Sequence, residues 1–321
     1  MSLSDSSPHI IMCMGFPGSG KSSYIEKNFP DALIISNDRS KTAFVDYTAA
    51  LDGEKLIVID NTNLVKSSRK KFLDLAKKEN KTVEMLYFPS TIEDCQIRVL
   101  HRQWQKFGRM FFTGNSTKHD IPDSHIFPIA ALFKSRLNME LPELEEGFSN
   151  ITNVSIPSPL SIFSDYPNRA LFLDIDGTLR KTDHLPNKYP TDPSQIILLK
   201  DAKHMRRKLE SYREQGYRLV GVSNQSGINK GTITEEICRA CMDRTLELLG
   251  VSIEILWCPH KTTPISCYCR KPQSGMGMHI IETYKVNPTQ SIMVGDQTSD
   301  QTFAERLGMK FIHADSFFKD C

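Results

Sequence analysis

The sequence predicts two α/β domains in series, and three observations support this. The chain has 321 residues, which exceeds one typical domain of roughly 100–200 residues and suits two. Short β-rich runs alternate with stretches of helical periodicity, a pattern typical of largely parallel sheets. The alternation is interrupted near 140–169, where four prolines disfavour regular structure, and then it restarts.

The predicted strands and helices set the domain boundaries. In the first domain, strands are expected at 9–14, 32–36, 56–60 and 82–88, and a helix at 67–79. In the second domain, strands are expected at 170–178, 218–225, 252–258 and 290–296, with helices near 199–215 and 234–249. We therefore expect a first domain over 1–155, a linker over 156–168 and a second domain over 169–321.

The composition is that of an ordinary globular protein. Hydrophobic residues make up 39% and charged residues 24% of the chain, which excludes a disordered or collagen-like protein. No apolar run reaches the roughly 18–20 residues that span a bilayer, and the N-terminus lacks the features of a secretory signal. We therefore expect an intracellular protein, cytoplasmic or nuclear, that is not secreted and does not bind membranes.

The net charge of +2 argues against a polycation but permits a local basic groove. Two runs of basic residues could line such a groove for a nucleic-acid strand, or could be solvated helix faces. They are Lys66, Arg69, Lys70 and Lys71 in the first domain, and Arg206, Arg207 and Lys208 in the second.

Residues 15–22, GFPGSGKS, match the P-loop pattern G-x-x-x-x-G-K-[ST] between an expected strand and an expected helix. Its glycines let backbone N–H groups converge on phosphate oxygens, and the following helix N-terminus favours anions. The pattern predicts a nucleoside triphosphate site, with Lys21 near the β- and γ-phosphates and Ser22 on Mg²⁺. The expected ATP-binding residues are Gly15, Pro17, Gly18, Ser19, Gly20, Lys21 and Ser22.

Polar residues follow two further strands of this domain. Asp38 could accept the proton of an attacking hydroxyl as a general base, or could cap the next helix. Asp60 could hold Mg²⁺ through water and Asn61 could contact the acceptor, or both could cap the helix that contains Ser67. Because ligands of open α/β sheets lie at the carboxyl ends of strands, we favour the catalytic interpretation.

Together, GFPGSGKSS, SND, IDNTN followed by SSR, and PELEEGFSNI at 142–151 resemble the kinase domain of polynucleotide kinase-phosphatases over most of 9–155. The resemblance implies transfer of the γ-phosphate of ATP to a 5′-hydroxyl of DNA or RNA. It implies that Asp38 activates that hydroxyl, with Asn37 where the family often has Arg. A lid arginine is also expected for the transferred phosphoryl group. Arg102 is preferred over Arg109, although both could lie on a solvated helix face.

Residues 174–178, Asp-Ile-Asp-Gly-Thr, follow an apolar strand and are the signature of the haloacid-dehalogenase phosphotransferase superfamily. The resemblance implies that Asp174 attacks phosphorus and forms an aspartyl-phosphate, and that Asp176 protonates the leaving group and later activates water. Further residues in the expected order are Ser223 and Asn224 at the phosphoryl group and Lys271 for charge neutralisation. Asp296 is expected to bind Mg²⁺ directly, and Asp300 to support that site or to serve as an alternative ligand. Asp174 and Asp176 complete the expected Mg²⁺ site.

The spacing C-x-H-x6-C-x-C predicts a closed tetrahedral Zn²⁺ site in a loop over 258–269. The expected ligands are Cys258, His260, Cys267 and Cys269, with a disulfide or free thiols as the alternatives. This segment resembles the zinc loop of heptose-bisphosphate and histidinol-phosphate phosphatases, which implies a structural zinc that positions Arg270 and Lys271. Arg270 is then a candidate for binding the substrate's leaving group. Cys238 and Cys241 are expected to be packing residues.

The resemblances together imply a bifunctional nucleic-acid end-healing enzyme that phosphorylates 5′-hydroxyl ends and removes 3′-phosphates. Its expected cofactors are ATP, Mg²⁺ and a structural Zn²⁺. Its expected partners are DNA or RNA ends, and a nucleic-acid ligase is left open as a further partner. The zinc loop favours the alternative, a small-molecule kinase fused to a sugar-phosphate or histidinol-phosphate phosphatase. A nucleic-acid-binding scaffold without activity is the third interpretation, and the intact Lys21, Asp38, Asp174 and Lys271 argue against it.

Overall fold

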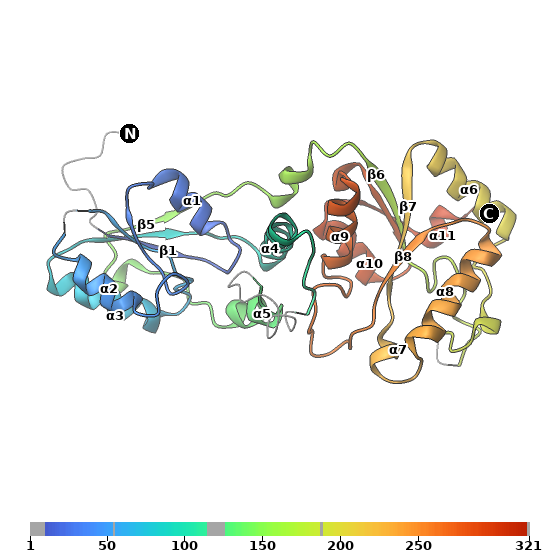
Figure 1. The fold of residues 1–321 in the computed structure, drawn as a ribbon, viewed down its shortest axis with the longest axis horizontal. Helices are drawn as coiled ribbons and strands as arrows, with labels where there is room; N and C mark the ends of the chain where they lie inside the picture. Colours follow the sequence, from blue (N-terminus) through green and yellow to red (C-terminus); the bar gives the residue numbers. More distant parts are fainter. Residues whose placement is uncertain (1–9, 54, 114–125, 187–188, 320–321) are drawn as a thin grey trace. The chain divides into compact units, whose positions relative to one another are not determined.

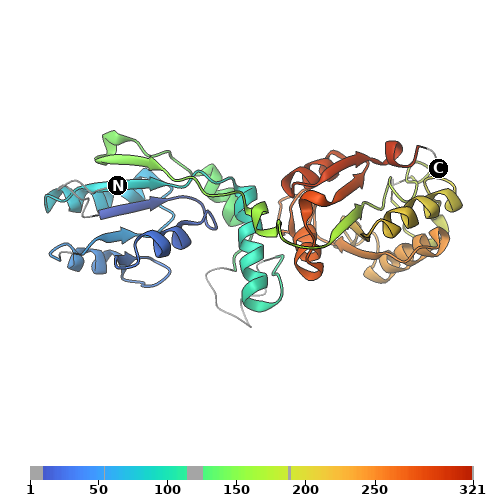
Figure 2. The same cartoon turned by 90° about the horizontal axis from the view of Figure 1, so that it is seen from above.

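The computed structural model describes residues 10–53, 55–113, 126–186 and 189–319. The chain divides into two compact units, one formed by Met1–Val99 and Ala130–Ser158 and the other by Leu100–Ile129 and Pro159–Cys321. This division differs from the predicted boundaries, because the segment 100–129 belongs to the second unit and not to the first. Figures 1 and 2 show the elements of both units coloured along the sequence.

The first unit is built on a parallel sheet of five strands in the order β2-β3-β1-β4-β5. The strands are β1 (Ile10–Met14), β2 (Leu33–Ile35), β3 (Ile57–Ile59), β4 (Val83–Tyr87) and β5 (Asn150–Asn153). The α-helices are α1 (Lys21–Asn28), α2 (Ala43–Ala50), α3 (Lys66–Lys78), α5 (Ala130–Leu137) and the first part of α4 (Ile92–Phe107). A 3₁₀ helix, η2 (Leu144–Glu146), precedes β5.

Helices cover both faces of this sheet. On one face Ile11 and Cys13 of β1 pack with Ile25 of α1. On the other face Met14 contacts Arg69 of α3, because successive side chains of a strand point to opposite faces. In Figure 1, α1 lies above the sheet, and α2 and α3 lie below it. Burial on both faces explains why β1 is apolar at every position.

The second unit has its own parallel sheet of five strands, in the order β10-β9-β6-β7-β8. The strands are β6 (Arg169–Leu173), β7 (Tyr217–Asn224), β8 (Glu254–Cys258), β9 (Ile292–Gly295) and β10 (Lys310–His313). The α-helices are α6 (Ala202–Glu214), α7 (Ser226–Asn229), α8 (Glu235–Leu249), α9 (Gly275–Tyr284), α10 (Thr298–Arg306) and α11 (Ala314–Phe317). The 3₁₀ helices are η3 (Pro159–Phe163), η4 (Pro193–Gln195) and η5 (Pro288–Gln290).

The second sheet is also covered on both faces. Leu171 and Leu173 of β6 pack with Met205 of α6 and Met242 of α8. The opposite face presents Phe172, whose ring lies 6.4 Å from that of Phe303 on α10. Because the strands are parallel, their carboxyl ends meet at one edge, where polar residues follow β6, β7 and β9.

The predicted α/β class with parallel sheets is confirmed, and all eight predicted strands are present. The sequence pattern does not predict β5 and β10, which lie at the edges of their sheets. An edge strand pairs on one side only and is partly open to solvent, so it needs no continuous apolar run. β5, with the sequence NITN, carries no such run. Among the described residues, no helix combines the length and apolar character needed to cross a membrane.

Arg69 neither lines a basic groove nor lies on a solvated helix face, so both predictions for its run are wrong at this residue. Its side chain is wholly buried and forms a bidentate ion pair with Glu146 at 2.7 and 2.8 Å. It also donates to the carbonyl oxygens of Asn63 and Glu140, at 3.0 Å each. Arg69 therefore fastens the 140–146 segment to the start of α3 and to the loop after β3.

The Arg69 ion pair predicts a large loss of stability when its acidic partner is neutralised. Glu146→Gln leaves a buried guanidinium without its counter-charge, and we expect the first unit to lose about 3–5 kcal/mol of unfolding free energy. Glu143→Gln is the matched control, because its pair with Lys66 is exposed to solvent and we expect its loss to change the stability little. Hydrogen exchange of the α3 amides measures both, and equal protection in the two variants would contradict this account.

Candidate active sites and metal centre

A glycine-rich loop over 15–20 joins β1 to the N-terminus of α1. Gly18 and Gly20 have φ angles of +80° and +95°, a left-handed conformation that glycine adopts without strain. A Cβ on Gly18 would lie 2.8 Å from Val99 Cγ2 and 3.0 Å from the Cys95 carbonyl oxygen. Both of these residues belong to α4, so the loop lies directly against this helix and requires glycine at position 18.

Lys21, the first residue of α1, lies inside this loop. Its buried ammonium donates to the carbonyl oxygens of Gly15 and Phe16 at 2.9 and 3.0 Å. Burial lowers the pKa of Lys21, and the carboxylate of Asp60 works against that shift. The Lys21 ammonium and the first N–H groups of α1 therefore lie at the same glycine-rich loop. Both are hydrogen-bond donors that can bind the oxygens of a phosphate group.

The residues predicted at the ends of β2 and β3 lie beside this loop. Ser22 Oγ donates to Asp60 Oδ2 at 2.8 Å, and Asn61 Oδ1 accepts from the Asn37 N–H at 2.8 Å. Asp38 is exposed next to Asn37. The Nδ2 atom of Asn61 is buried and finds no hydrogen-bond partner among the described residues. The first unit therefore offers Ser22 and Asp60 to a cation, and the Asn61 amide to a further ligand.

The helix-cap alternatives for these residues are excluded. The N-cap residue of α2 is Thr42, and that of α3 is Val65. Asp38, Asp60 and Asn61 therefore do not cap these helices.

The predicted lid residue, Arg102, lies in the part of α4 that belongs to the second unit. Arg109 also belongs to that unit, where its guanidinium lies 4.8 Å from the ring centroid of Phe111. Arg98, one helical turn before Arg102, belongs to the first unit and donates to the Pro157 carbonyl at 2.9 Å. Neither predicted arginine therefore belongs to the unit that contains the glycine-rich loop and Lys21.

The second unit gathers its predicted residues around the ammonium of Lys271. This buried group lies 2.5 Å from Asp174 Oδ1, 2.7 Å from Asp300 Oδ1 and 2.7 Å from the Val222 carbonyl oxygen. Burial alone would lower the pKa of Lys271, but Asp174 and Asp300 raise it above its ordinary value. Burial raises the pKa of Asp174 to about 7, and Lys271 opposes that shift. Lys271 is therefore a fixed positive charge beside the predicted nucleophile.

Three carboxylates converge next to this lysine. Oxygens of Asp174, Asp296 and Asp300 lie within 4.8 Å of one another. Asp296 Oδ1 is buried without a hydrogen-bond partner among the described residues. Position 177 must be glycine, because a Cβ there would lie 2.2 Å from Asp296 Oδ2. Clustered carboxylate oxygens with one buried and unpartnered atom fit a hard divalent cation such as Mg²⁺.

Asp300 and Asp176 have other partners as well. Asp300 Oδ2 accepts from the Gln297 N–H at 3.1 Å, which caps α10, while its Oδ1 pairs with Lys271. Asp176 does not join the carboxylate group, although the sequence predicts it as a Mg²⁺ ligand. Its Oδ1 accepts from Arg180 Nε at 2.8 Å and its Oδ2 from Gln225 Nε2 at 2.7 Å. The Asp176 carboxylate is therefore held by Arg180 and Gln225 and is not one of the three grouped carboxylates.

Ser223 and Asn224, at the end of β7, complete this edge of the sheet. Gln225 Nε2 donates to both Asp176 and Ser223 Oγ, which leaves the Ser223 hydroxyl proton for an external acceptor. Asn224 exchanges two hydrogen bonds with the backbone of Lys271, at 3.0 and 3.1 Å. These residues line a cavity of about 400 Å³, whose rim also includes Arg270 and Tyr189.

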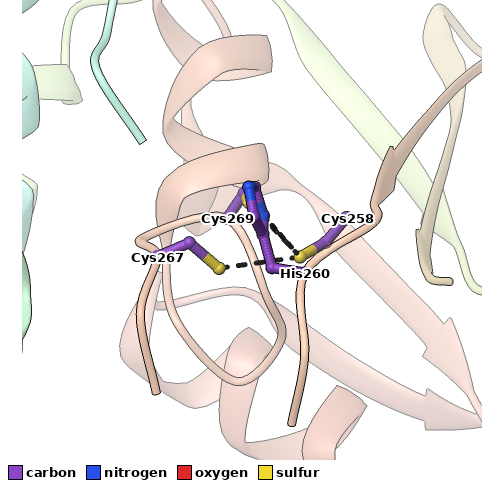
Figure 3. Close-up of side chains that lie close together, drawn as sticks. All are labelled: Cys258, His260, Cys267 and Cys269. Carbon is purple, nitrogen blue, oxygen red and sulfur yellow. Dashed lines mark hydrogen bonds between the residues drawn. The ribbon is translucent and has the colours of Figure 1, made fainter. Parts of the chain in front are cut away.

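The four predicted zinc ligands converge at the end of β8 (Figure 3). Cys258 Sγ lies 3.4 Å from His260 Nδ1, 3.6 Å from Cys267 Sγ and 3.3 Å from Cys269 Sγ. A disulfide would bring two sulfurs to about 2.0 Å, whereas tetrahedral zinc with bonds of about 2.0–2.3 Å separates its ligands by about 3.5 Å. The geometry therefore fits a tetrahedral metal centre and not a disulfide.

The loop over 258–269, called the zinc-type loop below, is held in place by hydrogen bonds to the segment 100–129. The Tyr268 side chain is fully buried, its N–H donates to the Phe112 carbonyl at 2.8 Å, and its hydroxyl donates to the Phe127 carbonyl at 3.2 Å. The ring of His279 on α9 packs edge-on against that of Trp104 on α4, with centroids 5.8 Å apart. These contacts explain why the segment belongs to the second unit.

Sequence reasoning missed three residues of these sites. Arg180 and Gln225 hold Asp176, and Tyr268 holds the zinc-type loop. Gln225 lies next to two predicted residues, which is a weak signal for its role. The roles of Arg180 and Tyr268 could not be recognised from the sequence, because most arginines lie on the surface and most tyrosines only pack against neighbours.

The comparison with protein families concerns the second unit. The family described as Polynucleotide kinase 3 phosphatase matches residues 169–318. The chain is 37% identical over 148 residues to the probable D-glycero-D-manno-heptose-1,7-bisphosphate 7-phosphatase of Thermoplasma volcanium. The aligned region covers 44% of this chain and 96% of that protein. The chain is also 31% identical over 148 residues to the histidine biosynthesis bifunctional protein HisB of Legionella pneumophila. That aligned region covers 45% of this chain and 40% of HisB.

One solved structure similar to this chain is that of D,D-heptose 1.7-bisphosphate phosphatase from B. bronchiseptica, complexed with magnesium and phosphate. The identity is 26%, and the TM-score is 0.39. The similarity covers 44% of this chain and 78% of that chain.

The cysteine–histidine cluster predicts a tightly bound metal. We expect the purified protein to contain about one zinc per chain, and Cys267→Ser to lose it and to unfold at a lower temperature. Cys238→Ser is the matched control, because this buried cysteine lies on α8 outside the cluster. Metal analysis and thermal unfolding measure both effects. A fully stable wild-type protein that contains no zinc would contradict the assignment.

Proposed function

Because the chain belongs, through residues 169–318, to the haloacid-dehalogenase superfamily of phosphatases, we propose that it heals nucleic-acid ends. In this proposal the second unit hydrolyses 3′-phosphates, and the first unit phosphorylates 5′-hydroxyls with ATP. The observation that carries it is that one chain holds two sets of phosphate-transfer residues. One set surrounds Lys21, and the other surrounds Lys271.

The phosphatase reaction follows from the residues around Lys271. Mg²⁺ would be held by Asp174 and Asp296 and would supply positive charge for the phosphoryl oxygens. Lys271 adds a second positive charge and keeps Asp174 in place. The hydroxyl of Ser223 has its proton available for a phosphoryl oxygen, because its oxygen already accepts from Gln225.

The reaction has two halves. In the first, Asp174 attacks phosphorus, the bond from phosphorus to the leaving oxygen breaks, and Asp176 gives its proton to that oxygen. In the second, water attacks phosphorus and passes a proton to Asp176, while the bond between phosphorus and Asp174 breaks. Phosphate leaves and both carboxyl groups return to their starting forms.

The kinase reaction would use the first unit. Lys21 and the loop N–H groups would bind the phosphates of ATP, and Ser22 with Asp60 would hold its Mg²⁺. Asp38 takes the proton of the 5′-hydroxyl while the hydroxyl oxygen forms a bond to the γ-phosphorus of ATP. The bond from the γ-phosphorus to the β-phosphate oxygen breaks, and ADP leaves. The exposed position of Asp38 suits a base that must meet the end of a long substrate. A nucleic-acid ligase could then seal the ends that the two reactions produce.

A metabolite phosphatase is the second candidate, and a specific observation favours it. The relative from Thermoplasma volcanium is named for a heptose bisphosphate and is matched over 96% of its length. The four-residue metal cluster is also what the resemblance to this small-molecule branch implies. The nucleic-acid substrate is preferred because of the family matched at 169–318 and the kinase-type residues of the first unit.

Two separate oligonucleotides test the proposed substrates. One bears a 5′-hydroxyl and the other a 3′-phosphate, because gain and loss of phosphate on a single strand would leave its mass unchanged. With ATP, Mg²⁺ and the full chain, we expect the first to gain a phosphate and the second to lose one, as measured by mass spectrometry. Hydrolysis of a heptose bisphosphate with no loss of the 3′-phosphate would support the second candidate instead.

Substitutions should separate the two activities. Lys21→Ala removes the charge beside the ATP phosphates, so we expect kinase activity to fall at least about 10²–10³-fold with phosphatase activity retained. Asp174→Asn removes the nucleophile, so we expect phosphatase activity to fall by more than about 10⁴-fold with kinase activity retained. The two variants are controls for each other. A folded variant that lost both activities would argue against two independent sites.

A further inference from the structure

Arg180 is a buried charged residue that the reaction described above does not use. It lies four residues after Asp176, its side chain is 1% exposed, and its Nε donates to Asp176 Oδ1 at 2.8 Å. We propose that Arg180 is the positioning residue of the phosphatase. In this proposal it fixes the position of the Asp176 carboxyl group at the pocket, from which the protonated form gives its proton to the leaving oxygen. This inference rests on the proposed role of Asp176 but not on the identity of the substrate.

The guanidinium of Arg180 is itself held from the other side. Its Nη1 donates to the Cys241 carbonyl and to Thr245 Oγ1, both at 3.1 Å. Thr245 is fully buried, and its hydroxyl donates to the Cys241 carbonyl at 2.8 Å. Both residues belong to α8, which packs into the hydrophobic core of the second unit. The planar fork of Arg180 therefore connects a rigid helix to the Asp176 carboxylate.

The backbone around Arg180 is equally constrained. The Gly177 N–H donates to the Arg180 carbonyl at 2.9 Å, and the Arg180 N–H donates to the Ile175 carbonyl at 3.1 Å. These bonds close the turn that carries Asp176 and Arg180. The spacing between the two side chains is thus set by the turn and does not depend on a flexible loop.

The second oxygen of Asp176 is also occupied. Gln225 Nε2 donates to Asp176 Oδ2 at 2.7 Å, and the Gln225 N–H donates to the Cys258 carbonyl at 2.8 Å. Rotation of Asp176 towards Asp174 would break the bonds from both Arg180 and Gln225. These two partners explain why Asp176 lines the pocket but stays outside the group of Asp174, Asp296 and Asp300.

A positioning role for proton transfer has a specific kinetic signature. An alkoxide leaving group, as in a sugar or nucleotide phosphate, needs a proton as its bond to phosphorus breaks, whereas p-nitrophenolate leaves without one. Loss of a well-placed acid typically costs 10²–10⁴-fold. If Arg180 acts only on overall structure, both kinds of substrate should suffer equally.

The experiment compares Arg180→Gln with the wild-type full chain on p-nitrophenyl phosphate and on alkyl phosphates. The alkyl phosphates are a 3′-phosphorylated oligonucleotide and a heptose bisphosphate, and the comparison uses whichever the wild type hydrolyses. We expect kcat/KM on the alkyl phosphate to fall about 10²-fold and kcat/KM on p-nitrophenyl phosphate to fall less than about threefold. The comparison uses kcat/KM because this ratio reports the first half of the reaction, whereas the hydrolysis of the aspartyl-phosphate is common to both substrates. Equal losses on both substrates, or no loss, would overturn the proposal.

Three further variants keep the test decisive if Arg180→Gln folds poorly. Arg180→Lys keeps the charge but not the fork, and Thr245→Val removes one anchor of the guanidinium. We expect both to lose activity selectively on the alkyl phosphate, but less than Arg180→Gln does. Arg239→Gln, at an exposed position of the same helix over Trp257, should leave both activities unchanged. Equal losses on both substrates in Arg180→Lys and Thr245→Val would likewise overturn the proposal.

The same experiment separates this inference from the proposed function. Hydrolysis of the heptose bisphosphate but not of the oligonucleotide would reject the nucleic-acid substrate, while the ratio of the two losses would still test Arg180. Hydrolysis of the oligonucleotide with equal losses in Arg180→Gln would reject the role of Arg180 and leave the substrate assignment intact.

Discussion

The ammonium of Lys271 is the interaction on which the second unit's site depends. It is buried between Asp174 and Asp300 at the base of the cavity, so one positive charge holds two carboxylates beside each other. Removal of Lys271 would leave two buried carboxylates without a counter-charge, which is far more costly than the loss of an exposed ion pair. The Asp300 carboxylate in turn caps α10, and the backbone of Lys271 is held by Asn224. One charge network thus fixes residues from four separate parts of the chain.

The first unit uses a different arrangement to gather positive charge. Its lysine is bound by backbone carbonyls of the loop itself, and no carboxylate lies within hydrogen-bond distance of its ammonium in the contacts described. Asp60, the acid with the larger electrostatic effect on Lys21, accepts a hydrogen bond from Ser22. The lysine can therefore exchange weak carbonyl contacts for phosphate oxygens without breaking an ion pair. The second unit's lysine, by contrast, is paired with two carboxylates, those of Asp174 and Asp300.

Much of this organisation could be predicted from the sequence because it depends on local patterns. Apolar runs identify strands that are buried on both faces, and parallel pairing brings Asp174, Ser223 and Asp296 to one edge. What could not be predicted depends on contacts between distant segments. Arg69 belongs to a basic run in sequence but is neutralised by Glu146, 77 residues further on. Arg180 reaches Thr245 on α8, 65 residues away, and no spacing rule indicates that pairing.

The assignment of 100–129 to the second unit has a consequence for how this protein could be divided. That unit is discontinuous in the chain, and the part contributed from 100–129 supplies the carbonyl oxygens that hold Tyr268. A cut at the proline-rich stretch after Ser158 would therefore not release an intact second unit. A chimaeric protein joined at that point would contain the grouped carboxylates and the four cysteine and histidine ligands. It would lack the segment 100–129, whose carbonyl groups hold Tyr268. The two units of this chain are consequently not interchangeable modules, although each has its own sheet.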